Sequence, residues 1–539
     1  MKKRHLTMAC LLAVTLTACG SAGTGPANSP ADAAQTTEAV PVAGDSLQDP
    51  TGSAPEQGAA GSEAAKEGEE ESDMNTNEIE QAQKAFQEVE PGKSFKNLLS
   101  HNPCITQRFC ADPGVMVYDG RVYVYATNDG DALPQRKEKN DYGKIRSINM
   151  MSSSDLVNWE DHGSIPVAGK DGIASWAGNS WAPCACHKQI GGKEQFFLYF
   201  ANSGNGIGVL RADSPTGPWE DPLGEAIVPR NTPGIEGVPW LFDPAVLADE
   251  DGNGYLYFGG GVPEGREADP GSFRVVKLTD DMLHLDGVPA VIDVPWGFED
   301  SCINRIGDTY YYSYCTNWSG ENPLGIARIG YMTSDSPMGP FTYQGTCFNN
   351  PGDFFGTTGN NHHTIISFEG EQYIFYHAEM LNREMYGEML GYRTTHVDKL
   401  PMADGLFGNA RGTTEGVKQL SNVDAFAEQS ASSFAWQAGV EISGLGETQA
   451  LLGAGDWIGV SGVDFASGAK KVKLCAQSAE GTWIRVTKGT VNGEVLAFLR
   501  VPASDELQEI SAEVSGAEGV CNLYFAAAGD VMLKTWCFE

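Results

Sequence analysis

The chain has few basic residues for its length. Its 539 residues include 36 Lys and Arg against 71 Asp and Glu, which gives a formal net charge of −35 at pH 7. A net negative charge of this size repels nucleic acid and other anionic polymers, because a protein binds such polymers through Lys and Arg side chains that neutralise their charge. The composition therefore excludes nucleic-acid partners and favours a neutral ligand such as a sugar.

Paired cysteine motifs are also missing. The sequence has 12 cysteines, but none form a CxxC pair, and Cys184 and Cys186 are separated by a single residue. A zinc site or a disulfide scaffold would need a regular spacing, so neither is expected. For an exported protein, this many unframed cysteines would suit an organism that lives without oxygen.

Alternating strand and helix patterns are absent as well, which disfavours a two-lobed solute-binding lipoprotein. The marked apolar run near the start, Met8 to Leu16, follows Lys2, Lys3 and Arg4 and has the pattern of a bacterial export signal. Its end, Leu16 to Gly20, resembles a lipobox, which implies that Cys19 is diacylated. An ordinary signal peptide with a chance cysteine is the alternative. We therefore expect a lipoprotein signal at 1–19 and a protein lipid-anchored at the outer face of the bacterial cell membrane, or secreted.

Residues 20–90 are rich in Ala, Gly, Ser, Thr, Pro and Glu and contain no aromatic residue before Phe86. Such a segment buries too little apolar area to offset the entropy of ordering, so a disordered acidic linker is predicted.

Five loosely repeated units occupy residues 91–421. Each begins at a marked residue, continues into a short apolar strand, turns at Gly or Asp-Gly and returns as an aromatic-rich strand. Units of this kind at intervals of about sixty residues predict a five-bladed β-propeller. The segment SPTGPW at 214–219 recurs as SPMGPF at 336–341, which predicts matching outer turns on two blades.

Residues 422–539 change to short alternating strands, which predict a β-sandwich of the jelly-roll type. The chain is therefore expected to be all-β, with a propeller followed by a sandwich.

The phase of the repeats points to a site. The innermost strand of each propeller blade lines the central channel, so residues in the same phase converge on one axis. That phase holds Asp112, Trp181, Asp243, Glu299 and the pair His362-His363. Cleavage of a glycosidic bond needs an acid on one side and a base on the other. Three carboxylates around one channel mouth therefore predict a sugar-cleaving site; the alternative is that the Asp-Pro pairs only form turns.

These motifs resemble glycoside hydrolase family 43: Ala111-Asp112-Pro113, Trp181-Ala182-Pro183, Phe242-Asp243-Pro244, Glu299, and Gly359 to His363. The resemblance implies a five-bladed propeller that inverts the anomeric centre. It makes Asp112 the general base, Glu299 the general acid, and Asp243 the residue that raises the pKa of the acid and orients it. Asp300-Ser301 follows Glu299 where the family commonly has a small residue and proline, so Asp300 is the alternative acid.

The resemblance suggests further roles, each with a structural alternative. Trp181 is a candidate platform for a sugar ring or a core residue of its blade. His362 is a candidate ligand of a channel ion, commonly calcium, and His363 a candidate substrate contact, whereas either could be a structural histidine. Arg393 could contact substrate hydroxyls or form a salt bridge.

The C-terminal domain resembles a family-6 carbohydrate-binding module through Ala427-Glu428 and the run from Gly455 to Phe465. The resemblance makes Glu428 a candidate ligand of a structural calcium. The stretch between Tyr524 and Trp536 lacks a loop tryptophan, so sugar binding by this domain is doubtful, and Trp457 and Trp536 are candidate core residues.

The leading hypothesis is an inverting α-L-arabinofuranosidase that trims arabinosyl residues from plant hemicellulose or pectic side chains, with no cofactor required for chemistry. The segment Gly391 to Leu400 is similar to arabinofuranosidase and arabinanase members of the family. β-Xylosidase and endo-arabinanase activities are close alternatives. A surface lipoprotein that binds glycan without cleaving it is the alternative from a different class.

Overall fold

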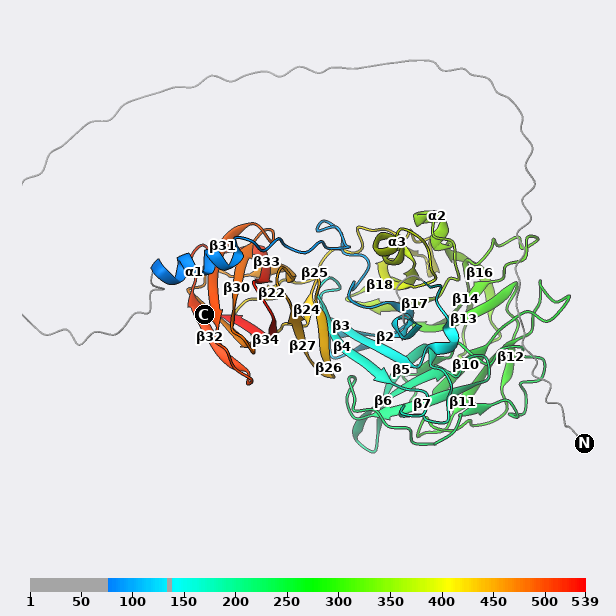
Figure 1. Ribbon diagram of the computed structural model, residues 1–539. Helices are drawn as coiled ribbons and strands as arrows, with labels where there is room; N and C mark the ends of the chain where they lie inside the picture. Colours follow the sequence, from blue (N-terminus) through cyan, green and yellow to red (C-terminus); the bar gives the residue numbers. More distant parts are fainter. Residues whose placement is uncertain (1–75, 133–137) are drawn as a thin grey trace, which may run out of the picture. The chain divides into compact units, whose positions relative to one another are not determined.

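The computed structural model describes residues 76–132 and 138–539 and consists mainly of antiparallel strands (Figure 1). The predicted signal, Cys19 and most of the predicted linker lie outside the described residues. Within the described ranges, no helix is long and apolar enough to cross a membrane.

Five sheets make up the first domain. Their strands are β1 (Cys110–Tyr118), β2 (Arg121–Asn128), β3 (Ser147–Ser153) and β4 (Trp159–Pro166); β5 (Trp181–Ile190), β6 (Lys193–Ala201), β7 (Gly206–Ala212) and β8 (Val228–Pro229); β9 (Ala245–Ala248), β10 (Gly254–Gly259), β11 (Phe273–Leu278) and β12 (Ala290–Ile292); β13 (Gly297–Ile306), β14 (Thr309–Thr316), β15 (Ile329–Ser334) and β16 (Thr342–Phe348); and β17 (His363–Phe368), β18 (Glu371–Ala378) and β19 (Thr394–Lys399).

The connecting elements are short. They are η1 (Asp129–Ala132), η2 (Tyr142–Lys144), α2 (Pro351–Phe355), α3 (Met380–Tyr386), and the hairpin of β20 (Met402–Ala403) and β21 (Leu406–Phe407).

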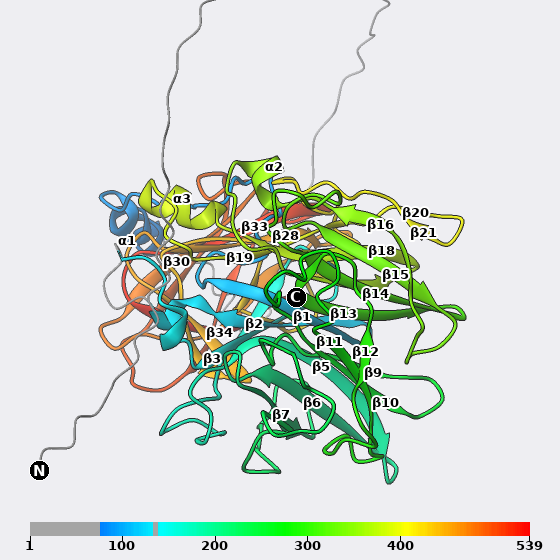
Figure 2. The ribbon, with the colours of Figure 1, turned by 90° about the vertical axis from the view of Figure 1, so that its right-hand side faces the viewer.

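The first strands of the five sheets form a closed ring. β1 contacts β5, β5 contacts β9, β9 contacts β13, β13 contacts β17, and β17 returns to β1. Figure 2 shows the sheets fanning outward from the middle of the domain, where β1, β5 and β13 lie. Apolar and aromatic side chains fill the space between neighbouring sheets, as in the cluster that joins Phe197 of β6 to Leu256 of β10. The predicted five-bladed propeller is confirmed.

The two echoed segments occupy equivalent outer positions. Tyr125 of the first blade donates its hydroxyl hydrogen to the Pro215 carbonyl at 2.6 Å, and Tyr257 of the third blade does the same to Pro337 at 2.6 Å. In each case the second-strand tyrosine of one blade holds the outer turn of the next. The expected matching turns are therefore present.

Two six-stranded sheets form the C-terminal sandwich. One sheet contains β22 (Val423–Asp424), β25 (Trp436–Ala438), β28 (Trp457–Asp464), β30 (Thr482–Lys488), β31 (Glu494–Val501) and β33 (Val520–Ala527). The other contains β23 (Gln429–Ser430), β26 (Glu441–Leu445), β27 (Glu447–Leu452), β29 (Lys471–Gln477), β32 (Gln508–Glu513) and β34 (Val531–Phe538). Trp536 lies in the core between them, 1% exposed, which confirms it as a core residue.

The sandwich is joined to the first blade by backbone and side-chain contacts. β24 (Ser433–Phe434) pairs with β4 and becomes the fifth strand of that blade's sheet. Asp161 of β4 accepts hydrogen bonds from Arg108, whose guanidinium also donates to the Ile442 carbonyl of the sandwich. Asn158 and Ser461 exchange two further hydrogen bonds across the same boundary.

The predicted disordered linker extends too far toward the propeller. Residues Thr76–Phe86 form helix α1, and the chain that follows is buried in part against the sandwich. Composition did not predict the helix, because a short amphipathic helix needs only two or three apolar residues when these pack on an apolar surface of the folded protein. Ala82 and Phe86 are those residues here.

Candidate active site

Local irregularities in the innermost strands turn the acidic side chains into the channel. The register of β1 shifts between Ala111 and Gly114, that of β5 between Trp181 and Cys184, and that of β13 between Glu299 and Cys302. The residues at these bulges have left-handed backbones: Asp112 (φ 46°), Ala182 (φ 39°) and Asp300 (φ 70°), with Asp243 (φ 49°) at the matching place before β9. A bulge re-aims a side chain that regular pleating would point elsewhere.

The bulges meet at one cavity of about 310 Å³. Asp112, Asp243 and Glu299 line it, and each is no more than 9% exposed. Trp181, His362 and Arg393 line it too. The structure therefore brings together six of the seven residues predicted for the propeller site; the exception is His363.

Asp112 is held as a carboxylate by the groups around it. Arg393 Nη1 lies 2.7 Å from Asp112 Oδ1, and His377 Nδ1 lies 3.2 Å from the same oxygen. Burial alone would raise the pKa of Asp112, but the charge of Arg393 and the His377 contact outweigh it and hold this pKa well below its usual range. Asp112 is therefore ionised at neutral pH, as a general base must be.

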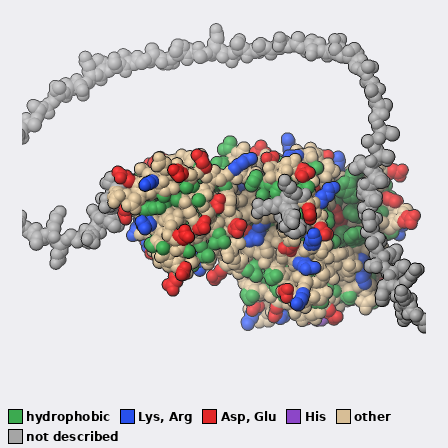
Figure 3. Space-filling view, in the orientation of Figure 1, with side chains coloured by type: hydrophobic (Ala, Val, Ile, Leu, Met, Phe, Trp, Pro, Cys, Tyr) green, Lys and Arg blue, Asp and Glu red, His purple; other side chains and the backbone are tan. Residues whose placement is uncertain are grey.

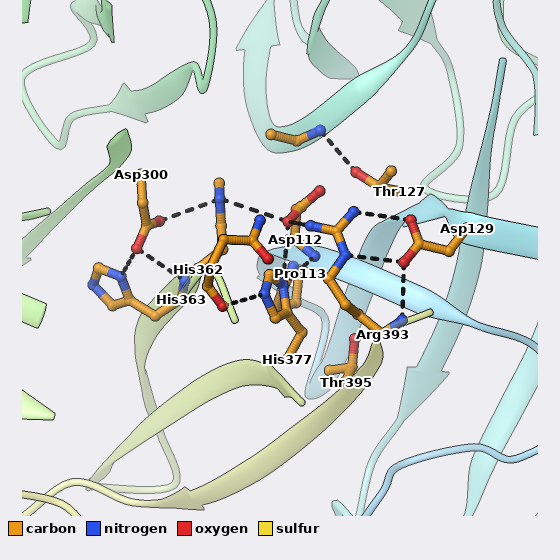
Figure 4. A network of polar contacts seen from close by, with 12 residues as sticks. Asp112, Pro113, Thr127, Asp129, Asp300, His362, His363, His377, Arg393 and Thr395 are labelled. Carbon is orange, nitrogen blue, oxygen red and sulfur yellow. Dashed lines mark hydrogen bonds and ion pairs between the residues drawn. The ribbon is translucent and has the colours of Figure 1, made fainter. Parts of the chain in front are cut away.

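Arg393 is itself fixed by a second carboxylate. Its Nε and Nη2 donate to the two oxygens of Asp129 at 2.9 and 2.8 Å, so one guanidinium bridges Asp129 and Asp112 (Figure 4). The ring of Tyr142 lies below it, 4.8 Å from the guanidinium carbon. Arg393 therefore forms the salt bridge that was the alternative prediction, and its contact with substrate stays a prediction.

Glu299 has the opposite environment. Burial raises its pKa well above the usual value, and the charges of Asp243, Asp300 and Asp112 raise it further. Its Oε1 is buried and has no hydrogen-bond partner among the described residues. A protonated carboxyl group with a free oxygen in a cavity is suited to donate a proton.

Asp243 lines the same cavity as Asp112 and Glu299. Its Oδ2 accepts a hydrogen bond from the Asp300 backbone N–H at 2.9 Å. Burial and the charges of Asp112 and Asp300 raise the pKa of Asp243. The charge of Asp243 in turn raises the pKa of Glu299, so the two carboxyl groups do not readily ionise together. The charge of Asp243 acts on the pKa of Glu299 in the predicted direction, but Asp243 itself resists ionisation, so its role in tuning and orienting the acid stays a prediction.

The two neighbouring histidines point in different directions. His362 lines the cavity, with Nδ1 3.8 Å from Asp112 Oδ1 and Nε2 3.2 Å from Asp300 Oδ1. His363 is 1% exposed and bonds to Ser313 Oγ and Asp300 Oδ2 instead. Consecutive residues of an extended chain point to opposite sides, so only one of the pair can reach the cavity. The prediction that His363 contacts substrate is wrong.

Asp300 is paired with His363. Burial alone would lower the pKa of His363, but Asp300 raises it to about 10, so the two form a buried ion pair. Asp300 does not line the cavity. The geometry therefore favours Glu299 over the alternative acid.

Aromatic side chains form the walls and rim. The Trp181 indole donates to the Tyr142 carbonyl at 3.0 Å and stands edge-on to the Tyr142 ring, which keeps Trp181 a candidate sugar platform. Trp240 and Trp318 also line the cavity and remain 43% exposed. Exposed tryptophans beside a cavity that holds carboxyl groups suit the apolar faces of sugar rings.

The described residues contain no cluster of side chains that matches the predicted calcium sites. Within residues 76–132 and 138–539, no group of three or more His, Cys, Asp and Glu side chains is arranged to hold a metal ion. Glu428 is exposed, and Thr535 donates to it at 3.4 Å. The described residues therefore give no support to a metal held by acidic and His side chains, and metal binding at His362 and Glu428 stays a prediction.

Sequence reasoning missed Asp129 and His377. Both lie at the channel end of the second strand of a blade: Asp129 directly follows β2, and His377 is the next-to-last residue of β18. That shared position is the signal that could have found them.

The family comparisons agree with these two domains. Residues 100–407 match the sequence model of Glycosyl hydrolases family 43, and residues 430–539 match that of Carbohydrate binding module (family 6).

Individual proteins match across both domains. The chain is 44% identical over 473 residues to an arabinoxylan arabinofuranohydrolase from Paenibacillus polymyxa, covering 81% of this chain and 74% of the relative. It is 44% identical over 467 residues to one from Bacillus subtilis (strain 168), covering 80% and 90%. A crystal structure of a family 43 arabinoxylan arabinofuranohydrolase from Bacillus subtilis, in complex with cellotetraose, superposes with a TM-score of 0.80 at 41% identity, covering 83% of this chain and 99% of that one.

Proposed function

The chain belongs to glycosyl hydrolases family 43, and from this premise we propose that it is an inverting α-L-arabinofuranosidase that removes arabinosyl side chains from arabinoxylan. The observation that carries the proposal is the contrast within one cavity between ionised Asp112 and protonated Glu299. An inverting glycosidase needs one carboxyl group of each kind.

The reaction follows from these states. Asp112 removes a proton from a water molecule, whose oxygen attacks the anomeric carbon of the bound sugar. Glu299 gives its proton to the glycosidic oxygen as the bond to the anomeric carbon breaks. Attack from the face opposite the leaving group inverts the anomeric centre. No cofactor takes part in these steps.

The cavity and its rim support removal of a side chain. A volume of about 310 Å³ is at the small end of ligand pockets and suits a small sugar unit. Trp240 and Trp318 line this cavity and remain 43% exposed, which supports contact with the chain that bears the sugar. The relatives that match most of this chain are named for release of arabinose from arabinoxylan, which supports the same substrate here.

The charge distribution agrees with a neutral polysaccharide. Acidic and basic side chains are interspersed over the face drawn in Figure 3. The net charge of the whole chain is −35. A neutral sugar polymer meets no electrostatic penalty on approach, whereas an anionic polymer would.

A substrate panel tests the proposal. Arabinose should be released from arabinoxylan at a higher kcat/KM than from linear arabinan, and xylose should not be released from unbranched xylo-oligosaccharides. Preferred release of xylose would favour the β-xylosidase alternative, and internal cleavage of arabinan would favour the endo-arabinanase. Glycan binding without any released sugar would favour the non-catalytic lipoprotein.

We also propose that the protein is exported and anchored through a lipid on Cys19. The basic start, the apolar run and the lipobox-like segment from Leu16 to Gly20 support this location. Cys19→Ala should move the protein from the membrane fraction to the soluble fraction of the cell envelope or the medium. Retention of the variant in the membrane fraction would contradict the anchor.

A further inference from the structure

One sheet of the sandwich is apolar on both faces. Ile458, Ile484 and Phe525 belong to the core between the two sheets. Their chain neighbours Trp457, Trp483 and Tyr524 belong to a separate apolar cluster. Because neighbouring residues of a strand point to opposite faces, the second set covers the outside of the sandwich. An antiparallel sheet with one solvated face would carry polar residues there.

The chain's own N-terminal segment covers this outer face. We call residues 76–100 the strap. Ala82 (0% exposed) and Phe86 (9% exposed) of α1 join the aromatic cluster, and Val89 and Leu98 pack beside it. Figure 1 shows α1 lying against β30, β31 and β33. Trp457, Trp483 and Tyr524 are left 2%, 8% and 1% exposed.

Side-chain contacts fix the helix in one place. The Phe86 ring lies 6.1 Å from the Phe498 ring of β31, and the Arg485 guanidinium carbon lies 4.8 Å from the Phe86 ring on another side. A cation over an aromatic face and a ring pair both depend on geometry, so they specify a position as well as burying area.

Backbone groups fix the rest of the strap. Gly92 N–H donates to the Gly455 carbonyl at 2.8 Å, and the Trp457 indole donates to the Gly92 carbonyl at 2.9 Å. Farther along, the Trp436 indole donates to the Ser100 carbonyl at 3.0 Å. Two tryptophans of the outer face thus use their polar atoms on the strap and have none to offer a sugar hydroxyl.

We infer that the outer aromatic face of the sandwich is an internal docking site for residues 76–100 and does not bind glycan. The strap occupies the flat aromatic surface that a sugar chain would need, and it makes the sandwich the point where the N-terminal part of the chain joins the folded enzyme. The inference concerns a surface away from the catalytic cavity, so it stands or falls separately from the proposed activity.

Limited trypsin digestion of the full chain tests the docking. Lys84 is exposed on α1, but cleavage beside it requires the helix to open. Ala82→Glu combined with Phe86→Ser should speed cleavage at Lys84 at least tenfold and shift tryptophan emission to longer wavelength. Gln83→Glu, on the exposed side of the same helix, is the matched control and should behave as the parent chain. Rapid cleavage of the parent at Lys84 would overturn the docking.

Two further measurements avoid dependence on the double variant. Hydrogen exchange on the parent chain should show protection of residues 80–92 comparable to that of β31, and exchange as fast as in an unfolded peptide would contradict the docking. Retention of the parent on an arabinoxylan affinity gel should be unchanged by Trp483→Ala, with unfolding temperature recorded for both proteins. A several-fold loss of retention in a folded Trp483→Ala protein would overturn the statement that this face does not bind glycan.

Discussion

The Arg393 guanidinium joins the catalytic carboxylate Asp112, 2.7 Å away, to the buried carboxylate of Asp129. Asp112 and Arg393 are 281 residues apart in the chain and meet only because the ring of blades closes. The bridge therefore holds a positive charge against Asp112.

Arg393→Met should move the acid limb of the kcat/KM profile to higher pH. Asp112 must be ionised to act as base, and its pKa is depressed, so activity in the parent persists far into the acid range. Loss of the cation raises that pKa, by about 1–3 units for a close opposite charge, and activity is then lost at a higher pH. His377 and His362 still face Asp112 in this variant, while Asp243 and Glu299 have raised pKa values and resist ionisation. Arg393→Lys keeps the positive charge and should shift the acid limb less. Identical pH profiles for Arg393→Met and the parent would refute the effect of Arg393 on the pKa of Asp112.

Asp112→Asn should lower kcat on arabinoxylan by about 10²–10⁴-fold, because the amide cannot accept the proton of the attacking water. The side chain keeps its shape, so the unfolding temperature should change little. A variant with more than a tenth of the parent kcat would rule out Asp112 as the general base.

Glu299→Gln and Asp300→Asn separate the acid from its neighbour. The amide at 299 cannot protonate the leaving oxygen, so hydrolysis of arabinoxylan should fall by about 10²–10⁴-fold. Hydrolysis of a 4-nitrophenyl arabinofuranoside should fall far less, because nitrophenolate leaves without a proton. Asp300→Asn breaks the ion pair with His363 and should lower both rates by a similar factor. If Asp300→Asn, and not Glu299→Gln, slowed hydrolysis of arabinoxylan far more than hydrolysis of the 4-nitrophenyl substrate, Asp300 would be the general acid.

Trp240→Ala and Trp318→Ala should each raise KM for arabinoxylan several-fold while leaving kinetics on the 4-nitrophenyl arabinofuranoside nearly unchanged. A stacked aromatic side chain contributes through the sugar that it covers, and the small substrate has no main chain to cover. Val288, 65% exposed and outside the cavity, supplies the control Val288→Ala. Equal effects on both substrates would place the tryptophans at the cleaved sugar instead.

A reducing agent should leave the unfolding temperature unchanged. All ten cysteines of the described residues are free. Burial raises the pKa of Cys104 to about 12, so its unreactive thiol form persists at neutral pH. Titration with a thiol reagent should find ten accessible thiols from these residues only after denaturation. A fall of several degrees under reduction would reveal a disulfide.

The sequence predicted the blades well because strand periodicity and Gly-rich turns are local signals. It placed Glu299 and Trp181 in the same phase as Asp112 and Asp243, although both lie one residue before the left-handed bulge positions that Asp300 and Ala182 occupy. A bulge adds one residue to one strand, but β1 is buried on both faces around its bulge, so no alternation of apolar and polar residues marks the extra residue.

The missed residues depend on contacts across the ring. Asp129 and His377 contact Arg393 and Asp112, which lie on other blades; their position at the end of a second strand is visible in the sequence, but no local pattern specifies these partners. The strap was missed for a related reason: its helix is short and polar, and only the aromatic surface of the sandwich makes it stable.

The pairing of β24 with β4 has a consequence for how the two domains can be separated. Ser433 lies opposite Glu160 and Phe434 opposite Trp159, so the sandwich closes the outer border of the first blade. Truncation of the protein after the fifth blade would leave backbone groups at this border without hydrogen-bond partners. An exposed strand edge of this kind can pair with strands of other molecules and cause aggregation. A propeller expressed without the sandwich should therefore aggregate more readily than the two-domain chain.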